Sequence, residues 1–491
     1  MIVSRRTLML SVGAAAFGSA LPFRRSFGHP DIKEFRLAAK PATVNIIGSG
    51  SPDTSVLAYD GIVPGPELRL RQGEPVRIVV SNSLREDTTV HWHGIRLSNA
   101  MDGVPGLTQK PIHPGESFTY DFTPSDAGTF WYHPHADTLQ QLGRGLAGAL
   151  IVEEPEPVPG IERDLLWFIE DWRLDDKERI APGFGNRMEA GMSGRIGSTV
   201  TINGRVPARV TVKAGERVRL RLVNAALARI VRLRFEGHKL VVVAHDGQPC
   251  DPYAPEGGRV VLGPAMRADL IIDMNGKPGQ TYRVIDDFYQ DLAYNLVALA
   301  YDPGKPARNI RPEAPQKLPA NPLPEPDLAA AERHEIALQG GMMGGMGMMG
   351  GGGGMMRRGG MMGGGGMMGG MRMMGGMGGG AIWAMNSMAM TGDGQPNMPP
   401  LLTLKLGKSC VLALRNETAW WHPMHLHGHS FRVISRNGKP NPRREWRDTI
   451  LMPPRESAEI AFVADNPGDW MFHCHVTDHQ EAGMMSVIRI T

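Results

Sequence analysis

The chain has 491 residues, of which 42% are hydrophobic, and its 53 basic and 50 acidic residues leave a formal net charge of +3. This near-balance gives no electrostatic footprint for nucleic acid, and the length is too great for one ordinary domain, so about three domains are expected. The chain has three cysteines, Cys250, Cys410 and Cys474. Because this number is odd, they cannot all be paired in disulfides, and at least one thiol is free or bound to metal.

The amino terminus has the features of an export signal, predicted over residues 1–28. The twin-arginine pattern SRRTLM begins at Ser4 and is followed by the apolar stretch Leu8–Leu21 and by the small residues GSA at Gly18. The apolar stretch is too short to span a bilayer, and no other segment approaches about 20 consecutive apolar residues. We therefore expect a protein without a membrane span that is exported to the periplasm.

Strand-like runs follow along the rest of the chain, including VRIVVSNSL, TVTING and RVRLRLVNA, and they are separated by turn dipeptides such as DG, NG and PG. Recurrent short strands without helical periodicity are typical of β-sandwiches, so the fold is predicted to be all-β. The proline-rich segments EEPEPVPG and PGKPARNIRPEAPQ mark domain boundaries. The predicted units are domain 1 at 31–154, domain 2 at 155–303, a linker at 304–326 and domain 3 at 327–491.

A low-complexity insertion, predicted at 341–398, interrupts the third domain. It holds nineteen methionines between Met342 and Met398, set among many glycines, and such a composition cannot bury a compact core. The insertion lies between the strand-like segments HEIALQ and IWAMNSMAM, so it belongs within a sandwich rather than between domains.

Ten of the sixteen histidines fall in four clusters, in chain order HWH at His91, HPH at His133, HPMHLH at His422, and HCH at His473 with His479 following. In a strand, residues i and i+2 point to the same face, so each H-x-H pair can present two imidazoles to one site. Imidazole is a common copper ligand, and the neutral ring binds without losing a proton. Four spaced clusters therefore predict a metal centre.

The HCH cluster predicts two sites on opposite faces of one strand. Cys474 points away from its two neighbours, so its thiolate can hold one copper while His473 and His475 serve others. A cysteine, two histidines and a weak methionine form a blue-copper site, and His479 and Met484 follow at short spacing. His422 stands apart from the next same-face pair and is the candidate for the second histidine of that site.

The motifs HWHG, HPH, HPMHLHGH and HCHVTDHQEAGM, with MDGVPGLTQKPIHPG and GTFWYHPH, resemble the copper signatures of multicopper oxidases in order and position. The resemblance covers nearly the whole chain after the signal. It implies three cupredoxin-like Greek-key sandwiches, the second serving as a spacer, and four copper ions. The implied ligands are His422, Cys474, His479 and Met484 for a type 1 copper, His91 and His425 for type 2, and His93, His133, His135, His427, His473 and His475 for a type 3 pair.

The resemblance also implies one-electron oxidation of a substrate at the type 1 copper, through Cys474, and four-electron reduction of dioxygen to water at the other three. That reaction consumes protons, and Asp102 matches a carboxylate that the family places near the type 2 copper; a turn aspartate before Gly103 is the alternative. Several bacterial relatives have glutamate directly after the last type 1 histidine, where this chain has Gln480. Glu481 is the candidate for a second proton-relay carboxylate, with Asp478 left open as an alternative.

The methionine-rich insertion points to Cu(I) as the substrate, because thioether sulfur is soft and neutral. Here the chain resembles periplasmic cuprous oxidases, although ETAWW at Glu417 replaces the aspartate and methionine that some of them carry before the third motif. A laccase-type oxidase of phenols and aromatic amines and a copper-sequestering protein are the alternatives. A monomer is expected. The remaining histidines are expected to be structural or exposed, and Cys250 and Cys410 are expected to be unpaired.

Overall fold

The computed structural model describes residues 32–307, 317–342, 381–392 and 399–491. The predicted export signal, the middle of the predicted linker and most of the methionine-rich insertion lie outside these residues. Within them, strands dominate and the three α-helices are short: α1 Thr138–Gly143, α2 Arg187–Ala190 and α3 Thr477–Glu481. The prediction of an all-β fold is confirmed. No helix in the described ranges has the length and apolar character needed to cross a membrane.

The first sandwich packs a sheet ordered β2-β1-β4-β6 against a sheet ordered β3-β8-β7-β5. The segment VRIVVSN alternates buried and half-buried side chains, as expected of a strand with one face on the core. A single turn of 3-10 helix at Asn99–Met101 precedes Asp102. The strands are β1 Lys33–Val44, β2 Thr54–Tyr59, β3 Gly65–Arg71, β4 Val76–Asn82, β5 His91–His93, β6 Ser117–Phe122, β7 Gly128–His133 and β8 Gly148–Glu153.

The second sandwich packs a sheet ordered β10-β9-β12-β17-β14-β15 against one ordered β11-β19-β18-β13-β16. A 3-10 turn lies at Glu256–Gly258. The strands are β9 Arg163–Trp172, β10 Thr199–Ile202, β11 Arg209–Val212, β12 Arg217–Asn224, β13 Val231–Phe235, β14 Leu240–His245, β15 Gln248–Tyr253, β16 Arg259–Leu262, β17 Arg267–Asp273, β18 Thr281–Asp286 and β19 Tyr294–Tyr301.

The third sandwich packs a sheet ordered β21-β20-β23-β29-β25-β26, with β27 beside β25, against one ordered β22-β31-β30-β24-β28. Its strands are β20 Glu332–Gly340, β21 Trp383–Met385, β22 Leu402–Leu404, β23 Ser409–Asn416, β24 His422–Leu426, β25 Phe431–Arg436, β26 Lys439–Pro440, β27 Trp446–Arg447, β28 Thr449–Met452, β29 Ser457–Val463, β30 Gly468–Cys474 and β31 Met485–Ile490.

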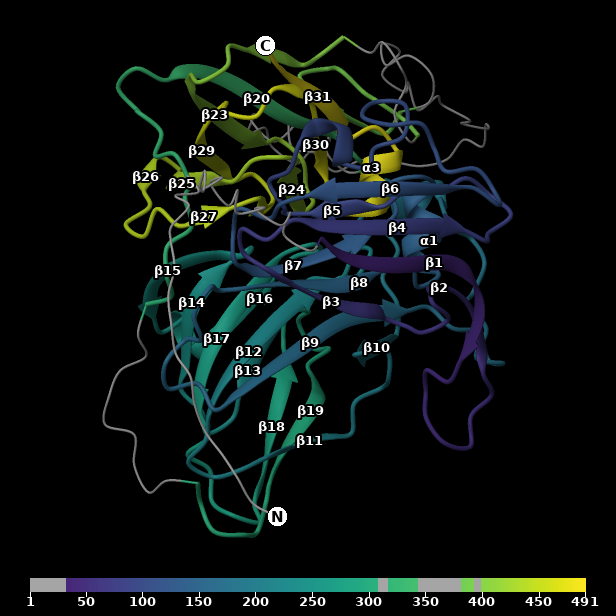
Figure 1. The fold of residues 1–491 in the computed structure, drawn as a ribbon, viewed down its shortest axis with the longest axis vertical. Helices are drawn as coiled ribbons and strands as arrows, with labels where there is room; N and C mark the ends of the chain where they lie inside the picture. Colours follow the sequence, from purple (N-terminus) through teal and green to yellow (C-terminus); the bar gives the residue numbers. More distant parts are fainter. Residues whose placement is uncertain (1–31, 308–316, 343–380, 393–398) are drawn as a thin grey trace, which may run out of the picture.

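One topology recurs in all three sandwiches. A parallel pair links β1 to β4, β9 to β12 and β20 to β23, and a second parallel pair links β3 to β8, β11 to β19 and β22 to β31. Figure 1 shows the teal second sandwich below, the yellow-green third above, and the blue first between them at one side. The strands that carry the histidine motifs thereby lie where the first and third sandwiches meet. The exact domain boundaries stay predictions.

Candidate metal centre

The four histidine motifs meet at the boundary between the first and third sandwiches. In the first, HWH forms β5, which pairs antiparallel with β7 and places His91 opposite His133. In the third, β24 pairs antiparallel with β30 and places His425 opposite His473. The rings of His91 and His425, from different domains, have centroids 5.7 Å apart, and their strands lie near the middle of the molecule in Figure 1.

Eight buried histidines converge there, and these are the residues predicted to hold the type 2 and type 3 coppers. His427 Nε2 lies 3.0 Å from His473 Nε2, and His475 Nε2 lies 3.4 Å from His133 Nε2. Three groups have all their donor atoms within 4.8 Å of one another: His91, His425 and His427; His91, His93 and His133; and His135, His427 and His473. Such close nitrogen pairs among neutral rings suit ligands that share a metal ion.

Hydrogen bonds at the back of the rings show which nitrogens face the centre. His91 Nδ1 donates to the Asp102 carbonyl oxygen at 2.8 Å, and His425 Nδ1 donates to the Asp448 carbonyl oxygen at 3.0 Å. The opposite nitrogen of each ring, Nε2, is buried without a hydrogen-bond partner. A buried polar atom without a partner is costly, and a metal ion would satisfy both, so these residues fit a copper-binding site.

The predicted type 1 residues form a second group on the other face of β30. Cys474 Sγ lies 3.5 Å from His422 Nδ1 and 3.7 Å from His479 Nδ1, and the two nitrogens are 3.1 Å apart. Met484 is fully buried, and its backbone bonds to Cys474 and His479. One thiol and two imidazole nitrogens within mutual reach, beside a buried thioether, are the donor set of a blue-copper site.

Partners outside the donor set hold the type 1 rings in place. His422 Nε2 is 2.8 Å from the hydroxyl of Thr418, and His479 Nε2 donates to the Met192 carbonyl oxygen at 2.8 Å. The backbone N–H of Val476 donates to Cys474 Sγ at 3.4 Å. Met192 belongs to the second sandwich, so that sandwich contacts a predicted copper ligand. The predicted role of this sandwich as a spacer stays a prediction.

Burial sets the protonation of the donors. Desolvation lowers the pKa of nine predicted ligand histidines, and at most of them the charge that neighbouring histidines would carry lowers it further. These are His93, His133, His135, His422, His425, His427, His473, His475 and His479. The pKa of His479 falls to about 3. Burial raises the pKa of the Cys474 thiol. At neutral pH these rings are therefore neutral and able to bind a metal, while the thiol would release its proton to solvent when a metal ion binds to the sulfur.

Asp102 lies beside the eight-histidine group, as the sequence predicts. Its Oδ2 is 2.9 Å from His427 Nδ1 and its Oδ1 is 3.3 Å from His91 Nδ1, and the side chain is buried. The carboxylate thus touches one ligand from each domain, where it can hold or release a proton. The role of Asp102 in proton transfer stays a prediction.

A second carboxylate at the same group, Asp448, was not predicted. Its Oδ1 lies 3.4 Å from His93 Nε2 and 3.5 Å from His425 Nδ1, and it is buried. Asp448 stands in the segment REWRDTI, whose composition resembles any charged strand connection. Only its position after β27, opposite the histidine strands, brings it to the site, so no local sequence signal could have identified it.

The two candidates for the second relay carboxylate lie at α3. Glu481 Oε1 accepts a hydrogen bond from the Leu139 backbone N–H at 2.8 Å in the first turn of α1, and Asp478 Oδ2 accepts one from the Arg195 N–H at 2.8 Å. Burial raises the pKa of Asp478. These contacts tie α3 to the first and second sandwiches. The relay role of Glu481 stays a prediction, and Gln480 between them is buried.

An unpredicted tryptophan covers the type 1 group. The Trp383 ring lies 5.0 Å from the His422 ring and 4.4 Å from the His479 ring, measured between centroids, and all three side chains are fully buried. Its indole N–H donates to the Ala190 carbonyl oxygen at 2.6 Å. Neither imidazole therefore offers an edge to solvent.

The other histidines in the described ranges stay outside both groups, and His429, which ends HPMHLHGH, is buried against Asp465, 3.7 Å from its carboxylate. The thiols of Cys250 and Cys410 form no disulfide, as predicted. The third cysteine, Cys474, is likewise free of a disulfide, which leaves its sulfur available to metal.

The fold and the two donor groups define a copper-binding oxidoreductase, and comparison with known proteins identifies its family. Multicopper oxidase family models match residues 41–157, 163–305 and 376–491. The crystal structure of a multi-copper oxidase from Pseudomonas thermotolerans is 34% identical, with a TM-score of 0.78, over 94% of this chain and 99% of that one. The chain belongs to the multicopper oxidase family.

Two further relatives are similar along their length. Multicopper oxidase MmcO of Mycobacterium tuberculosis is 29% identical over 476 residues, covering 91% of this chain and 85% of MmcO. A multicopper oxidase from Campylobacter jejuni, described as a metallo-oxidase, is 27% identical with a TM-score of 0.74, covering 95% and 93% of the two chains. The family uses dioxygen and a reducing substrate, and its three sandwiches are cupredoxin-like.

Met484→Leu is expected to raise the reduction potential of the type 1 copper. The axial thioether is predicted to stabilise Cu(II), and leucine of similar volume removes that contact at a cost of less than about 1.5 kcal/mol in folding. Redox titration of the blue band measures the potential. Met485→Leu, at the next residue and the first of β31, serves as the control and should leave the potential unchanged; the reverse result would make Met485 the axial ligand.

Proposed function

We propose that this multicopper oxidase is a cuprous oxidase, which oxidises Cu(I) to Cu(II) with dioxygen as acceptor and thereby serves copper tolerance. Bound coppers supply the redox chemistry, in which four one-electron oxidations of substrate are matched to the reduction of one dioxygen to water. The protein supplies ligands, proton-holding groups and control over which reductants reach the type 1 group.

The cover over the type 1 histidines is the observation that carries the proposal. Trp383 is buried against both rings, so a bulky phenol cannot touch either imidazole edge. A soft metal ion delivered by thioethers has no need of an open aromatic pocket.

The ends of the methionine-rich insertion are fixed at this cover. A side chain at Gly341 would collide with the Trp383 ring, so the two pack in contact. The Met342 N–H donates to the Gly191 carbonyl oxygen at 2.7 Å, and the Trp420 indole N–H donates to the Met342 carbonyl oxygen at 2.9 Å. The insertion therefore leaves and rejoins the sandwich beside the type 1 group, which supports a role in supplying Cu(I) there. The description of the Campylobacter jejuni relative as a metallo-oxidase agrees with this substrate class.

The ratio of Cu(I) to phenol turnover tests the substrate class. Deleting residues 343–380 should leave the blue band intact, because a change in the length of a chain connection costs little folding free energy and the predicted type 1 ligands lie outside this segment. Oxidation of Cu(I) at low copper should fall, while oxidation of a phenol or aromatic diamine should hold or rise. A matched variant with the same length, in which leucine replaces every methionine of 343–380, should behave in the same way if thioether sulfur is what matters.

Two other outcomes would replace the proposal. Unchanged Cu(I) turnover with lost phenol turnover in the deletion variant would establish a laccase-type oxidase. Copper uptake without oxygen consumption on either substrate, in the intact protein, would establish a copper-sequestering protein.

The twelve predicted ligands should hold four coppers per chain. Elemental analysis of the fully loaded protein, combined with quantitative electron paramagnetic resonance, measures the number and the types. One type 1 signal, one type 2 signal and a coupled pair without a signal are expected. Two coppers or fewer would contradict the assignment.

We also propose that the chain is exported to the periplasm in folded form. Replacing both arginines of the twin-arginine pattern, Arg5 and Arg6, with lysine should retain the protein in the cytoplasm. Cell fractionation measures the distribution, and periplasmic protein at the normal level in the lysine variant would refute this pathway.

A further inference from the structure

The three sandwiches meet at one buried ion pair directly behind the eight-histidine group. Arg267, the first residue of β17 in the second sandwich, donates to Asp448 of the third through Nη1 to Oδ1 at 2.8 Å and Nη2 to Oδ2 at 2.5 Å. Arg267 Nε also donates to the Thr129 carbonyl oxygen of the first sandwich at 3.2 Å. Both charged side chains are almost completely buried, at 0% and 1% exposure. A two-pronged arginine–carboxylate pair is geometrically specific, so it fixes the plane of the carboxylate.

Asp448 and Thr449 in turn contact one predicted ligand from the first sandwich, His93, and one from the third, His425. His93 Nε2 lies 3.3 Å from the Thr449 hydroxyl, which in turn donates to Asp448 Oδ1 at 2.8 Å. His425 Nδ1 donates to the Asp448 carbonyl oxygen and lies 3.2 Å from the Thr449 hydroxyl. His93 Nδ1 and His425 Nε2, on the opposite sides of the rings, are the buried nitrogens without a partner. The network therefore determines which nitrogen of each ring would be available to a metal.

The glycine that ends the HWHG motif is explained by the same pair. Gly94 has a φ of +87°, and a side chain there would collide with both Arg267 Nη2 and Asp448 Oδ2. The missing side chain at Gly94 of the first sandwich thus leaves room for the ion pair between Arg267 of the second sandwich and Asp448 of the third.

Asp246 completes the network from the second sandwich. Its Oδ1 accepts from the Arg267 backbone N–H at 2.8 Å, and its Oδ2 lies 3.4 Å from the Thr449 backbone nitrogen and 3.8 Å from Arg447 Nη1. Arg267 is therefore held at its backbone and at its guanidinium.

We propose that Arg267 is a positioning residue for the three-copper site, acting through Asp448 and Thr449 to aim His93 and His425. The inference rests on the proposed copper assignment. Residues that orient metal ligands in this way typically change metal affinity by about 10–100-fold when they are replaced. The type 1 group, on the other face of β30, makes no contact with this network in the described residues.

Replacing Arg267 with methionine tests the proposal. The copper-loaded variant should lose type 2 copper to a chelator at a concentration about 10–100-fold lower than the wild type requires. Its type 2 electron paramagnetic resonance signal should change, while the blue type 1 band stays at its normal position. Arg267→Lys keeps the charge without the two-pronged geometry, so its type 2 signal should change less than that of Arg267→Met.

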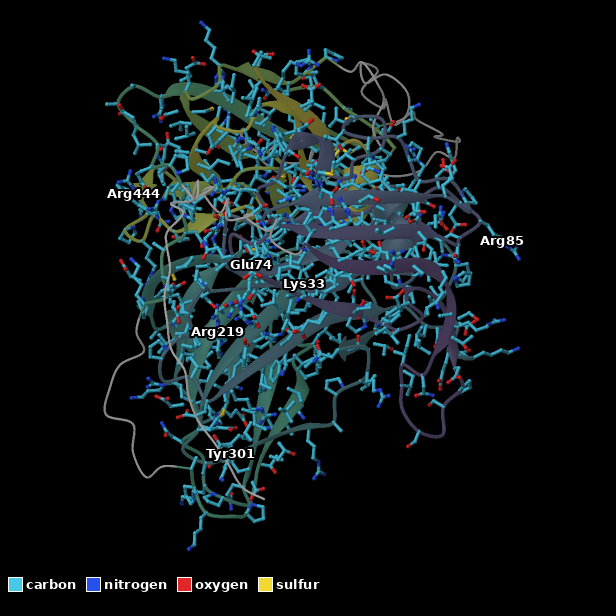
Figure 2. All side chains as sticks on the ribbon, in the orientation of Figure 1. Lys33, Glu74, Arg85, Arg219, Tyr301 and Arg444 are labelled. Carbon is cyan, nitrogen blue, oxygen red and sulfur yellow. The ribbon has the colours of Figure 1, made fainter. Side chains whose placement is uncertain are left out.

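Arg219→Met is the matched control. Arg219, labelled in Figure 2 on the second sandwich, is 3% exposed and donates to buried Asp269 from Nε at 2.9 Å and from Nη2 at 2.6 Å. This change also removes the arginine of a buried pair, in the strand next to β17, so it should cost similar thermal stability. The type 2 signal should stay normal in this variant. The same signal change in both variants, or in neither, would overturn the proposal.

Thr449→Val provides a test if the arginine variants fail to fold, because it removes only the hydroxyl. It should shift the type 2 signal and leave the blue band unchanged; a wild-type signal would overturn the proposal. A wild-type protein that binds no type 2 copper would instead refute the proposed function, so the two failures can be told apart.

Discussion

Replacing Cys474 with serine is expected to abolish both the blue absorption and the oxidase activity of the copper-loaded protein. The colour of a blue-copper site arises from the bond between thiolate and Cu(II), which a hydroxyl cannot provide. Cys474 Sγ is within 3.7 Å of both type 1 imidazole nitrogens, so no other described thiol can take its place. Visible absorption and oxygen consumption are the measurements.

The eight histidines on the other face should still bind copper in this variant, because their nitrogens do not depend on the sulfur. The control is Cys250→Ser, which alters a half-buried thiol of the second sandwich and should leave colour and activity intact. A blue Cys474→Ser protein would mean that another thiolate holds the type 1 copper.

Asp102→Asn is expected to slow oxygen reduction by about 10²-fold or more, the range found when a positioned proton-transfer group is lost. Asparagine keeps the shape and a hydrogen-bonding oxygen but cannot shuttle a proton at the position of Oδ2, 2.9 Å from His427 Nδ1. Reduction of the type 1 copper by substrate, without oxygen, should stay at the wild-type rate, because Asp102 contacts His427 and His91 rather than the predicted type 1 ligands.

Rapid mixing separates the two steps. Bleaching of the blue band under anaerobic conditions reports electron uptake, and its return on mixing with oxygen reports reoxidation. Asp126→Asn is the control, since Asp126 is equally buried but pairs with Arg96 at 2.8 Å instead of with a ligand. Equal reoxidation rates in wild type and Asp102→Asn would remove Asp102 from proton transfer.

Part of the metal centre could be predicted from residue spacing because several of its candidate donors lie on strands or directly after them. The two-residue period places His91 beside His93 and His425 beside His427 without any knowledge of the fold. The same period puts Cys474 on the opposite face from His473, which separates the two groups as the structure has them. The roles of the individual ligands, including His479 on α3, were implied by the resemblance to multicopper oxidases and stay predictions.

The supporting residues could not be predicted because they reach the site across domain boundaries. Arg267 and Asp448 are 181 positions apart, and Met192 contacts His479 from 287 positions away. Each is a single residue without a distinctive spacing. Trp383 shows the same limit, since only the packing of β21 reveals that it covers the type 1 rings.

Strand β12 shows that a correct secondary-structure pattern can conceal burial. Its alternating arginines would ordinarily mark a solvent-facing side, yet all its residues are buried. Arg221 Nη1 donates to the Thr129 hydroxyl of the first sandwich at 2.9 Å, so this face forms a domain boundary. Periodicity identifies the strand, and the neighbouring domain decides what covers it.

Because His473, Cys474 and His475 are consecutive residues of one polypeptide segment, covalent bonds within the third sandwich link the two metal groups. The group of eight histidines, in contrast, is contributed by two sandwiches, so its geometry depends on how these two sandwiches pack. Thermal motion at that boundary would alter the spacing of His91 and His425 but could not lengthen the covalent link. Electron transfer along the strand and oxygen reduction at the domain boundary thus depend on different parts of the structure. Gentle heating or mild denaturant should therefore impair oxygen reduction before it impairs electron transfer along the strand.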